Sequence, residues 1–232
     1  MPINLATLGQ TLLGNLSKKA VTVSPGGRGF RGDLIDSATF AETEYKLQWL
    51  IKGLLVEGQP MIVGGPKKTL KTGMMTDMVV SLAAGAPFLG RFTVPEKKRV
   101  AFLSGESGEA TLKTRAKQVC AARGLELASL PLFWNFRLPR LGKESDLTLL
   151  GKCLRLNGIQ VLVLDPLYLC LLAGVSDVQA SNLYQIGPLL SDVTQVCLQA
   201  GATIILVHHL RKNLAAPHQP PELDDLAFAG VQ

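Results

Sequence analysis

Short apolar runs alternate along the chain with segments in which apolar residues recur every three or four positions. A continuously apolar run is typical of a strand that is covered on both faces, as in a parallel sheet. Such runs occur at 61–63, 99–103, 132–136, 159–164 and 203–207. Helical spacing lies between them, at 75–83, 109–120, 145–156 and 181–199. The pattern predicts an α/β fold with a mostly parallel central sheet and helices on both faces.

The N-terminal part of the chain differs from the rest in its residue pattern and composition. Leucines near helical spacing in residues 1–19 predict a short amphipathic helix, and residues 20–37, rich in glycine and arginine, predict a mobile basic linker. We therefore expect an N-terminal extension over 1–42 and one folded domain over 43–232. The domain would begin with a helical or mixed segment at 43–55. Because the last residues are polar and proline-rich with no closing element, we expect this domain to be truncated at its C-terminus.

Composition narrows the class of protein. Hydrophobic residues make up 47% and charged residues 18%, which excludes a disordered chain. The formal net charge of +6 is compatible with a polyanionic partner. The four cysteines form no CxxC pair, so we expect reduced thiols, a cytoplasmic location and no zinc site. The N-terminus lacks the layout of a signal peptide and no apolar run approaches 18 residues, so no membrane span is expected.

The candidate chemistry begins after the first predicted strand. There the phosphate-loop pattern G-x-x-x-x-G-K-[ST] falls on eight consecutive residues, which we expect to bind nucleotide: Gly65, Pro66, Lys67, Lys68, Thr69, Leu70, Lys71 and Thr72. Backbone N–H groups and a helix N-terminus at such a loop attract phosphate. Lys71 would pair with the β- and γ-phosphates of ATP, and the Thr72 hydroxyl would ligate Mg²⁺.

The loop departs from the pattern at one position. Leu70 stands where the second glycine is usual. If the backbone there needs a positive φ, leucine is strained by about 1 kcal/mol or more. On the pattern alone, the segment could also be a basic turn between a strand and a helix.

Carboxylates follow two other predicted strands. Asp165 ends the apolar run at 159–164, the Walker B arrangement in which an aspartate holds Mg²⁺ through water. Glu106 follows the run at 99–103 and is the candidate general base that activates the attacking water. Glu109 is the alternative base, although a glutamate at a helix N-terminus is also favoured by the helix dipole.

Two histidines end the last predicted strand. Ligands gather at the carboxyl ends of parallel strands, so His209 or His208 could sense the γ-phosphate through a hydrogen bond. A metal site made by both histidines is disfavoured, because neighbouring strand residues point to opposite faces. Tyr45 and Trp49 could stack on the adenine base, but core packing is also open to Trp49.

Five blocks of residues occur in an order that resembles a known family. They are Gly64-Gly65-Pro66 with Lys71-Thr72, Ala84-Gly85-Ala86-Pro87-Phe88-Leu89-Gly90, Phe102-Leu103-Ser104-Gly105-Glu106, Leu164-Asp165-Pro166 and His208-His209-Leu210-Arg211-Lys212. Over about residues 45–230 the chain resembles the AAA_25 group of AAA-family ATPases. That group is similar to RepA-type hexameric helicases and RecA-like recombination ATPases.

The resemblance implies a RecA-like P-loop NTPase that uses ATP and Mg²⁺, assembles as a homo-oligomeric ring or filament, and acts on DNA. It places phosphate and Mg²⁺ at Lys71 and Thr72, the base at Glu106, Mg²⁺ at Asp165 and γ-phosphate sensing at His209. One alternative is a nucleotide-binding module with weak or no catalysis. Another is a small-molecule kinase with Arg137 and Arg140 in its lid. A dinucleotide-binding dehydrogenase is disfavoured because no G-x-G-x-x-G follows the first strand.

Overall fold

The computed structural model describes residues 32, 34–66, 69–172 and 183–209. The helix predicted over 1–19, most of the predicted linker and the C-terminal segment from 210 onward lie outside the described residues. Among the described residues, no helix is long and apolar enough to cross a membrane.

The centre of the molecule is a five-stranded sheet whose strand pairs are all parallel. Its order is β3-β7-β6-β4-β5. The strands are β3 (Met61–Gly65), β4 (Val100–Ser104), β5 (Leu132–Asn135), β6 (Val161–Asp165) and β7 (Thr203–His209). All five lie where the apolar runs predict strands. The central three carry almost entirely buried side chains, which explains why their sequences show no alternation.

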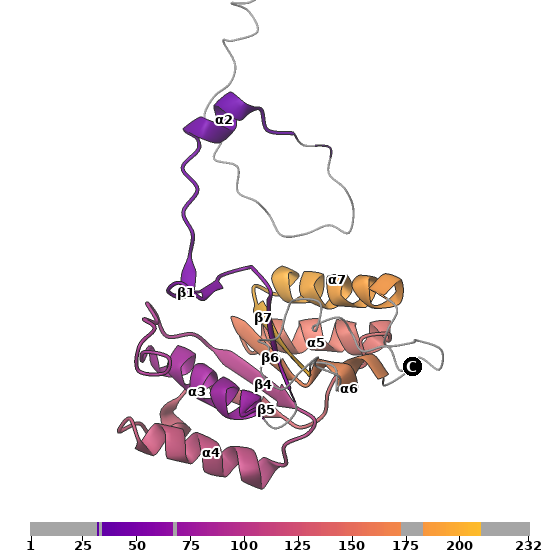
Figure 1. Ribbon diagram of the computed structural model, residues 1–232. Coiled ribbons are helices and arrows are strands. Elements are labelled where there is room, and N and C mark those ends of the chain that lie inside the picture. Colours follow the sequence, from indigo (N-terminus) through magenta and orange to yellow (C-terminus); the bar gives the residue numbers. More distant parts are fainter. Residues whose placement is uncertain (1–31, 33, 67–68, 173–182, 210–232) are drawn as a thin grey trace, which may run out of the picture.

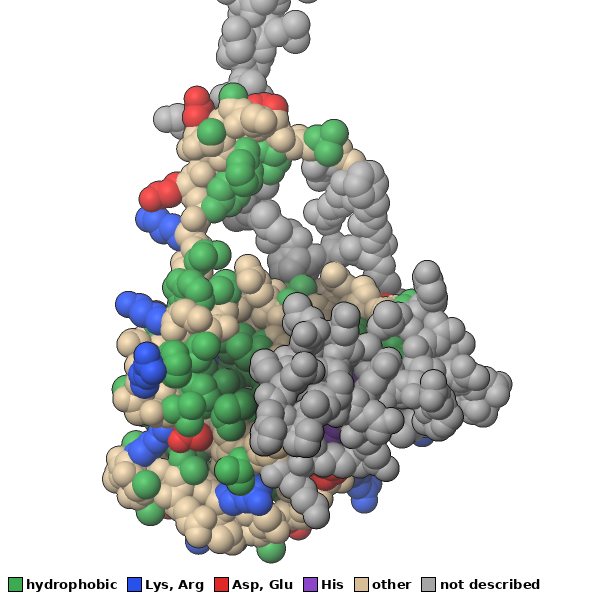
Figure 2. All heavy atoms as spheres, viewed as in Figure 1, with side chains coloured by type: hydrophobic (Ala, Val, Ile, Leu, Met, Phe, Trp, Pro, Cys, Tyr) green, Lys and Arg blue, Asp and Glu red, His purple; other side chains and the backbone are tan. Residues whose placement is uncertain are grey.

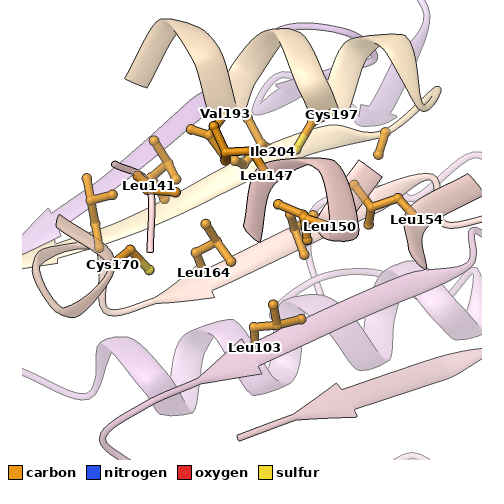
Figure 3. Close-up of a cluster of buried hydrophobic side chains, with 14 of the residues drawn as sticks. Leu103, Leu141, Leu147, Leu150, Leu154, Leu164, Cys170, Val193, Cys197 and Ile204 are labelled. Carbon is orange, nitrogen blue, oxygen red and sulfur yellow. The ribbon is translucent and has the colours of Figure 1, made fainter. Parts of the chain in front are cut away.

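Helices cover both faces of this sheet (Figure 1). The helices α3 (Lys71–Ala84) and α4 (Glu109–Ala121) pack on one face, together with side chains such as Val100 and Phe102. On the other face lie α5 (Glu144–Leu156), α6 (Leu167–Leu172) and α7 (Leu183–Gln199), which bury Ala101 and Leu103. Figure 3 shows the second cluster, in which α5 and α7 meet the sheet. The predicted α/β fold with helices on both faces is confirmed.

The segment at 43–55 differs from its prediction. A helical or mixed segment was predicted, and the structure has two short antiparallel strands, β1 (Trp49–Ile51) and β2 (Leu55–Val56). Leu50, Ile51 and Leu55 are buried against the α3 side of the sheet. Strands of three and two residues are too short to show the alternation of apolar and polar residues that predicts a strand. The hairpin forms because its side chains pack in the core, which the local sequence pattern does not indicate.

A short helix lies at the end of the predicted N-terminal extension over 1–42, where no helix was predicted. This helix, α2 (Ser37–Glu42), begins where the Asp36 carboxylate accepts a hydrogen bond of 2.9 Å from the Thr39 amide. It stands apart from the sheet on an extended segment (Figure 1). Its side chains and those beside it are exposed, including Phe40 and Tyr45, whose rings lie 5.1 Å apart. Figure 2 shows hydrophobic side chains on the surface of the region that contains α2. Two further short elements, α6 and the 3-10 turn Leu127–Ser129, were not predicted either.

Candidate functional site

The predicted site residues come from the carboxyl ends of four neighbouring strands. In the β3–β7 pair, Gly65 lies opposite His209, and in the β4–β6 pair Ser104 lies opposite Asp165. Because β7 and β6 are also neighbours, these ends form one row along a single edge of the sheet. Parallel strands therefore bring together residues that are far apart in the sequence.

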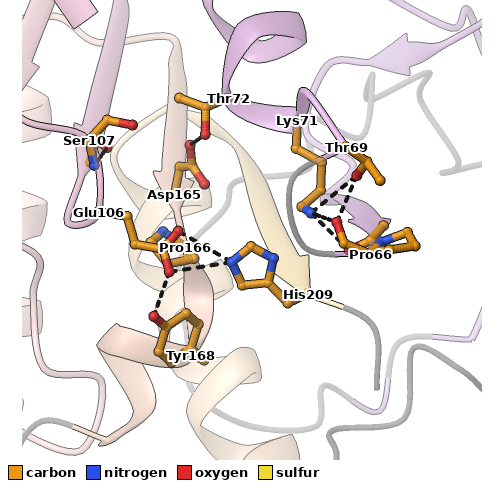
Figure 4. Close-up of polar contacts among 12 residues, drawn as sticks. Pro66, Thr69, Lys71, Thr72, Glu106, Ser107, Asp165, Pro166, Tyr168 and His209 are labelled. Atoms are coloured by element: carbon orange, nitrogen blue, oxygen red, sulfur yellow. Dashed lines mark hydrogen bonds and ion pairs between the residues drawn. The ribbon is translucent and has the colours of Figure 1, made fainter. Parts of the chain in front are cut away.

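The phosphate-loop segment connects β3 to α3. Lys71 is the first residue of α3 and only 6% exposed. Its Nζ atom donates hydrogen bonds to the backbone oxygens of Gly65 at 2.8 Å and Pro66 at 2.5 Å, and lies 3.5 Å from Thr69 Oγ1. The Thr69 hydroxyl also donates to the Pro66 oxygen. The lysine ammonium thus lies inside the turn made by its own loop (Figure 4). Lys67 and Lys68 lie outside the described residues.

The backbone of this loop has two special positions. Leu70 adopts the left-handed conformation with φ 58° and ψ 14°, and its side chain is 80% exposed. The position usually held by glycine therefore does have a positive φ here, and leucine occupies it at a conformational cost. At Gly65 a Cβ would lie 3.1 Å from Thr69 Oγ1 and 3.2 Å from Lys71 Cδ, so any larger residue would press on the lysine.

The loop is joined to the end of β6 by one hydrogen bond. The Thr72 hydroxyl donates to Asp165 Oδ2 at 2.7 Å. Asp165 is 3% exposed, and this burial raises the pKa of its carboxyl group, with the Thr72 hydrogen bond acting in the opposite direction. Burial lowers the pKa of Lys71, while the charges of Asp165 and Glu106 oppose that shift. A buried carboxylate, a hydroxyl and an ammonium group are therefore gathered within one small region.

Glu106 lies two residues beyond β4 and meets His209 from the end of β7. His209 Nε2 lies 3.3 Å from Glu106 Oε2 and 3.4 Å from Oε1, which makes an ion pair when the imidazole is protonated. The carboxylate is partly exposed at 40%, as expected of a group that meets a ligand. Glu109 instead occupies the first turn of α4 and is exposed.

His208 is the residue of β7 that precedes His209. It is buried, and burial lowers its pKa to about 4, with smaller effects from the charges of His209 and Lys71. It is therefore neutral at physiological pH. Within the described ranges, no group of three or more His, Cys, Asp or Glu side chains is placed so that it could hold a metal ion.

Two residues of the site were missed by the sequence analysis. Tyr168, in α6, donates a hydrogen bond of 2.5 Å to Glu106 Oε1, and its ring centroid lies 5.7 Å from that of His209. Gly105 is the second, because a Cβ there would lie 2.5 Å from Leu138 Cδ1 and 2.9 Å from Leu169 Cδ1. The only feature of the sequence that could have indicated Tyr168 and Gly105 is their position, since each follows a strand that ends at the site.

Other candidate residues lie elsewhere. Tyr45 packs with Phe40 beside α2, away from the sheet. Trp49 lies in β1 and is half-buried. The Arg140 guanidinium donates hydrogen bonds to both carboxylate oxygens of Asp146, near the start of α5. These contacts give no support to a kinase lid at Arg140.

Comparison with known proteins agrees with this geometry. A family model described as an AAA domain, AAA_25, matches residues 31–215. The chain belongs to this family. Among solved structures, 270 chains match. No curated protein sequence matches the chain.

One of the matching solved structures is described as an ATPase domain. The match has a TM-score of 0.53 at 13% sequence identity, and it covers 75% of this chain and 65% of that one. The chain thus spans about two thirds of the length of that ATPase domain. At this identity the likeness concerns the fold: this AAA_25 member has a RecA-like P-loop NTPase fold, with a five-stranded parallel sheet between two helical layers.

Proposed function

We propose that this AAA_25 domain binds ATP with Mg²⁺ and hydrolyses it. The observation that carries the proposal is the 2.7 Å hydrogen bond between Thr72 and Asp165. It joins the end of a phosphate-loop segment to a buried carboxylate at the end of β6, which is the pairing that a P-loop NTPase needs around its metal.

The phosphates would bind at the N-terminus of α3. The first N–H groups of a helix have no partner within the helix, and the helix dipole adds a partial positive charge there. Lys71 would exchange the carbonyl oxygens of Gly65 and Pro66 for phosphate oxygens. Its burial makes that exchange favourable, because an ammonium group in a poorly solvated place gains most from an anionic partner.

The residues present suit Mg²⁺. Thr72 and Asp165 supply a hydroxyl and a carboxylate, the hard oxygen donors that this ion prefers. Burial raises the pKa of Asp165, and a cation bound beside it would favour the ionised form of the carboxylate. When bound, Mg²⁺ supplies neutralisation of charge on the β- and γ-phosphates.

Glu106 would orient and deprotonate the attacking water. It stands at the next strand end beyond Asp165, with enough exposure to reach solvent. His209 contacts the same carboxylate and would report the presence of the γ-phosphate to Glu106. Glu109 is set aside as the base because it belongs to the first turn of α4.

Action on DNA, in a homo-oligomeric ring or filament in the cytoplasm, is part of the same proposal. Its support is the family membership, the basic net charge of +6 and the fold shared with an ATPase domain. Single-stranded DNA is expected to increase the rate of ATP hydrolysis. A rate that is the same with and without a single-stranded oligonucleotide would contradict this part of the proposal.

The test of nucleotide binding is calorimetric titration with ATP and Mg²⁺. Wild-type protein should show saturable binding, and Lys71→Ala should lose it. Lys113→Ala is the matched control, because Lys113 is an exposed lysine on α4. Binding that survives in Lys71→Ala, or that is absent from the folded wild-type protein, would overturn the proposal.

A second function is favoured by Leu70. Its left-handed backbone and the engagement of Lys71 by its own loop could suit a nucleotide-binding regulatory module that does not turn ATP over. The Glu106→Gln variant separates the two functions. Steady ATP hydrolysis that is lost in Glu106→Gln supports the ATPase, whereas tight ATP binding with no hydrolysis by the wild-type protein supports the module.

A further inference from the structure

Tyr168 makes the shortest described contact to the candidate base. Its hydroxyl donates to Glu106 Oε1 at 2.5 Å, while His209 Nε2 approaches the same carboxylate at 3.3 and 3.4 Å. The two rings lie beside each other, with centroids 5.7 Å apart and planes 44° apart. Figure 4 shows the carboxylate of Glu106 directed toward both rings.

The hydroxyl of Tyr168 is a dependable donor. Burial, followed by the hydrogen bond to Glu106, raises its pKa to about 12. It therefore stays protonated at physiological pH and donates to an ionised carboxylate, which makes a charge-assisted hydrogen bond stronger than one between neutral groups.

The surrounding packing fixes where Tyr168 can be. The first turn of α6 follows β6 directly, and its Leu169 packs on Gly105, where a Cβ would be 2.9 Å from Leu169 Cδ1. The absence of a side chain at Gly105 thus allows α6 to approach the segment that carries Glu106. The backbone N–H of Gly105 also donates to the Asp165 oxygen at 2.9 Å, which ties the two strand ends together.

We propose that Tyr168 is a positioning residue for ATP hydrolysis: it holds the Glu106 carboxylate in the orientation from which that carboxylate accepts a proton from the attacking water. The inference rests on the proposed ATPase function. Tyr168 fixes one oxygen, Oε1, and with it the orientation of the whole carboxylate, which His209 Nε2 approaches at 3.3 Å from Oε2 and 3.4 Å from Oε1. When His209 turns toward a γ-phosphate, the tyrosine keeps the base in place.

The test is Tyr168→Phe, which removes the hydroxyl and keeps the ring. Tyr45→Phe is the matched control, because Tyr45 is exposed and lies beside α2, away from the site. For each variant we would measure kcat with and without single-stranded DNA, ATP affinity by calorimetry, and the unfolding midpoint. Loss of one orienting hydrogen bond should lower kcat about tenfold in Tyr168→Phe, with ATP affinity and unfolding midpoint unchanged. Tyr45→Phe should behave as wild type.

The effect should also depend on the base. In a Glu106→Gln background, where the group that accepts the proton is absent, Tyr168→Phe should lower the residual rate much less than tenfold. An unchanged kcat in Tyr168→Phe would overturn the proposal. So would a kcat that falls together with ATP affinity or the unfolding midpoint, because that would indicate a merely structural role. Absence of hydrolysis by the wild-type protein would overturn the proposed ATPase function itself, so the two failures are distinguishable.

Discussion

The Thr72 hydroxyl donates a 2.7 Å hydrogen bond to Asp165 Oδ2 across 93 positions of sequence. If this pair holds Mg²⁺, removing the hydroxyl should remove the effect of the metal on nucleotide binding. Mg²⁺ should increase the affinity for ATP. We expect this increase to be about tenfold smaller in Thr72→Val and unchanged in Thr72→Ser, which keeps the hydroxyl. Calorimetric titrations with and without Mg²⁺ measure the difference. Equal behaviour of the two variants would contradict this role of the hydroxyl.

Leu70 carries a conformational cost that glycine would remove. We expect Leu70→Gly to raise the free energy of unfolding by about 0.5–1 kcal/mol, because glycine adopts a positive φ without strain. Leu89→Gly is a matched control, since Leu89 also has a positive φ of 51° and is exposed, but lies beyond α3. Urea unfolding should show a similar gain for both variants. A loss of stability in Leu70→Gly would refute the explanation by strain.

Gly105 lies where two leucines leave no room for a side chain. The Cβ of Gly105→Ala would lie 2.5 Å from Leu138 Cδ1 and 2.9 Å from Leu169 Cδ1, so α6 or these side chains must move. We expect a loss of about 1–2 kcal/mol in the free energy of unfolding and a lower kcat. Gly32→Ala, at an exposed position where a Cβ would meet no atom beyond its chain neighbours within 4 Å, should change stability by less than about 0.5 kcal/mol. Similar losses in both variants would show that contact with α6 is not the cause.

His208 should make the stability of the protein depend on pH. The unfolded chain takes up a proton at this residue near pH 6.5, whereas the folded chain does so only near pH 4, since burial lowers the pKa. Stability is therefore lost as pH falls from about 6.5 toward 4, by up to about 3 kcal/mol. Urea unfolding of wild type and His208→Leu between about pH 7.5 and pH 4 measures this. The variant should lose less stability over that range, and an equal loss would contradict the assignment.

The sequence predicted the sheet well because its central strands are buried on both faces. Runs such as 159–164 and 203–207 are apolar without alternation, and few other structures have this pattern. The same reasoning brought Lys71, Asp165, Glu106 and His209 to one edge of the sheet, since each stands at a predicted strand end or helix start. Their roles in ATP binding and hydrolysis stay predictions.

What the sequence could not predict depends on contacts between distant segments. The β1–β2 hairpin is stabilised by the packing of Leu50 and Leu55 in the core. Its strands are too short for their sequence pattern to predict them. Tyr168 was given no role from the sequence, because its hydrogen bond to Glu106 depends on the position of α6. The positive φ at Leu70 was foreseen only as a condition of the loop pattern, because leucine itself argues against it.

The row of four strand ends also makes ligand binding and folding a single equilibrium. A nucleotide at this edge would touch β3, β6, β4 and β7 at once, groups that no unfolded chain could gather. It would therefore bind the native state alone, and by mass action a ligand at about 100 times its dissociation constant would add about 2.7 kcal/mol to the stability of the whole sheet. In a cell, a fall in the supply of ATP would then lower the folded fraction of the protein.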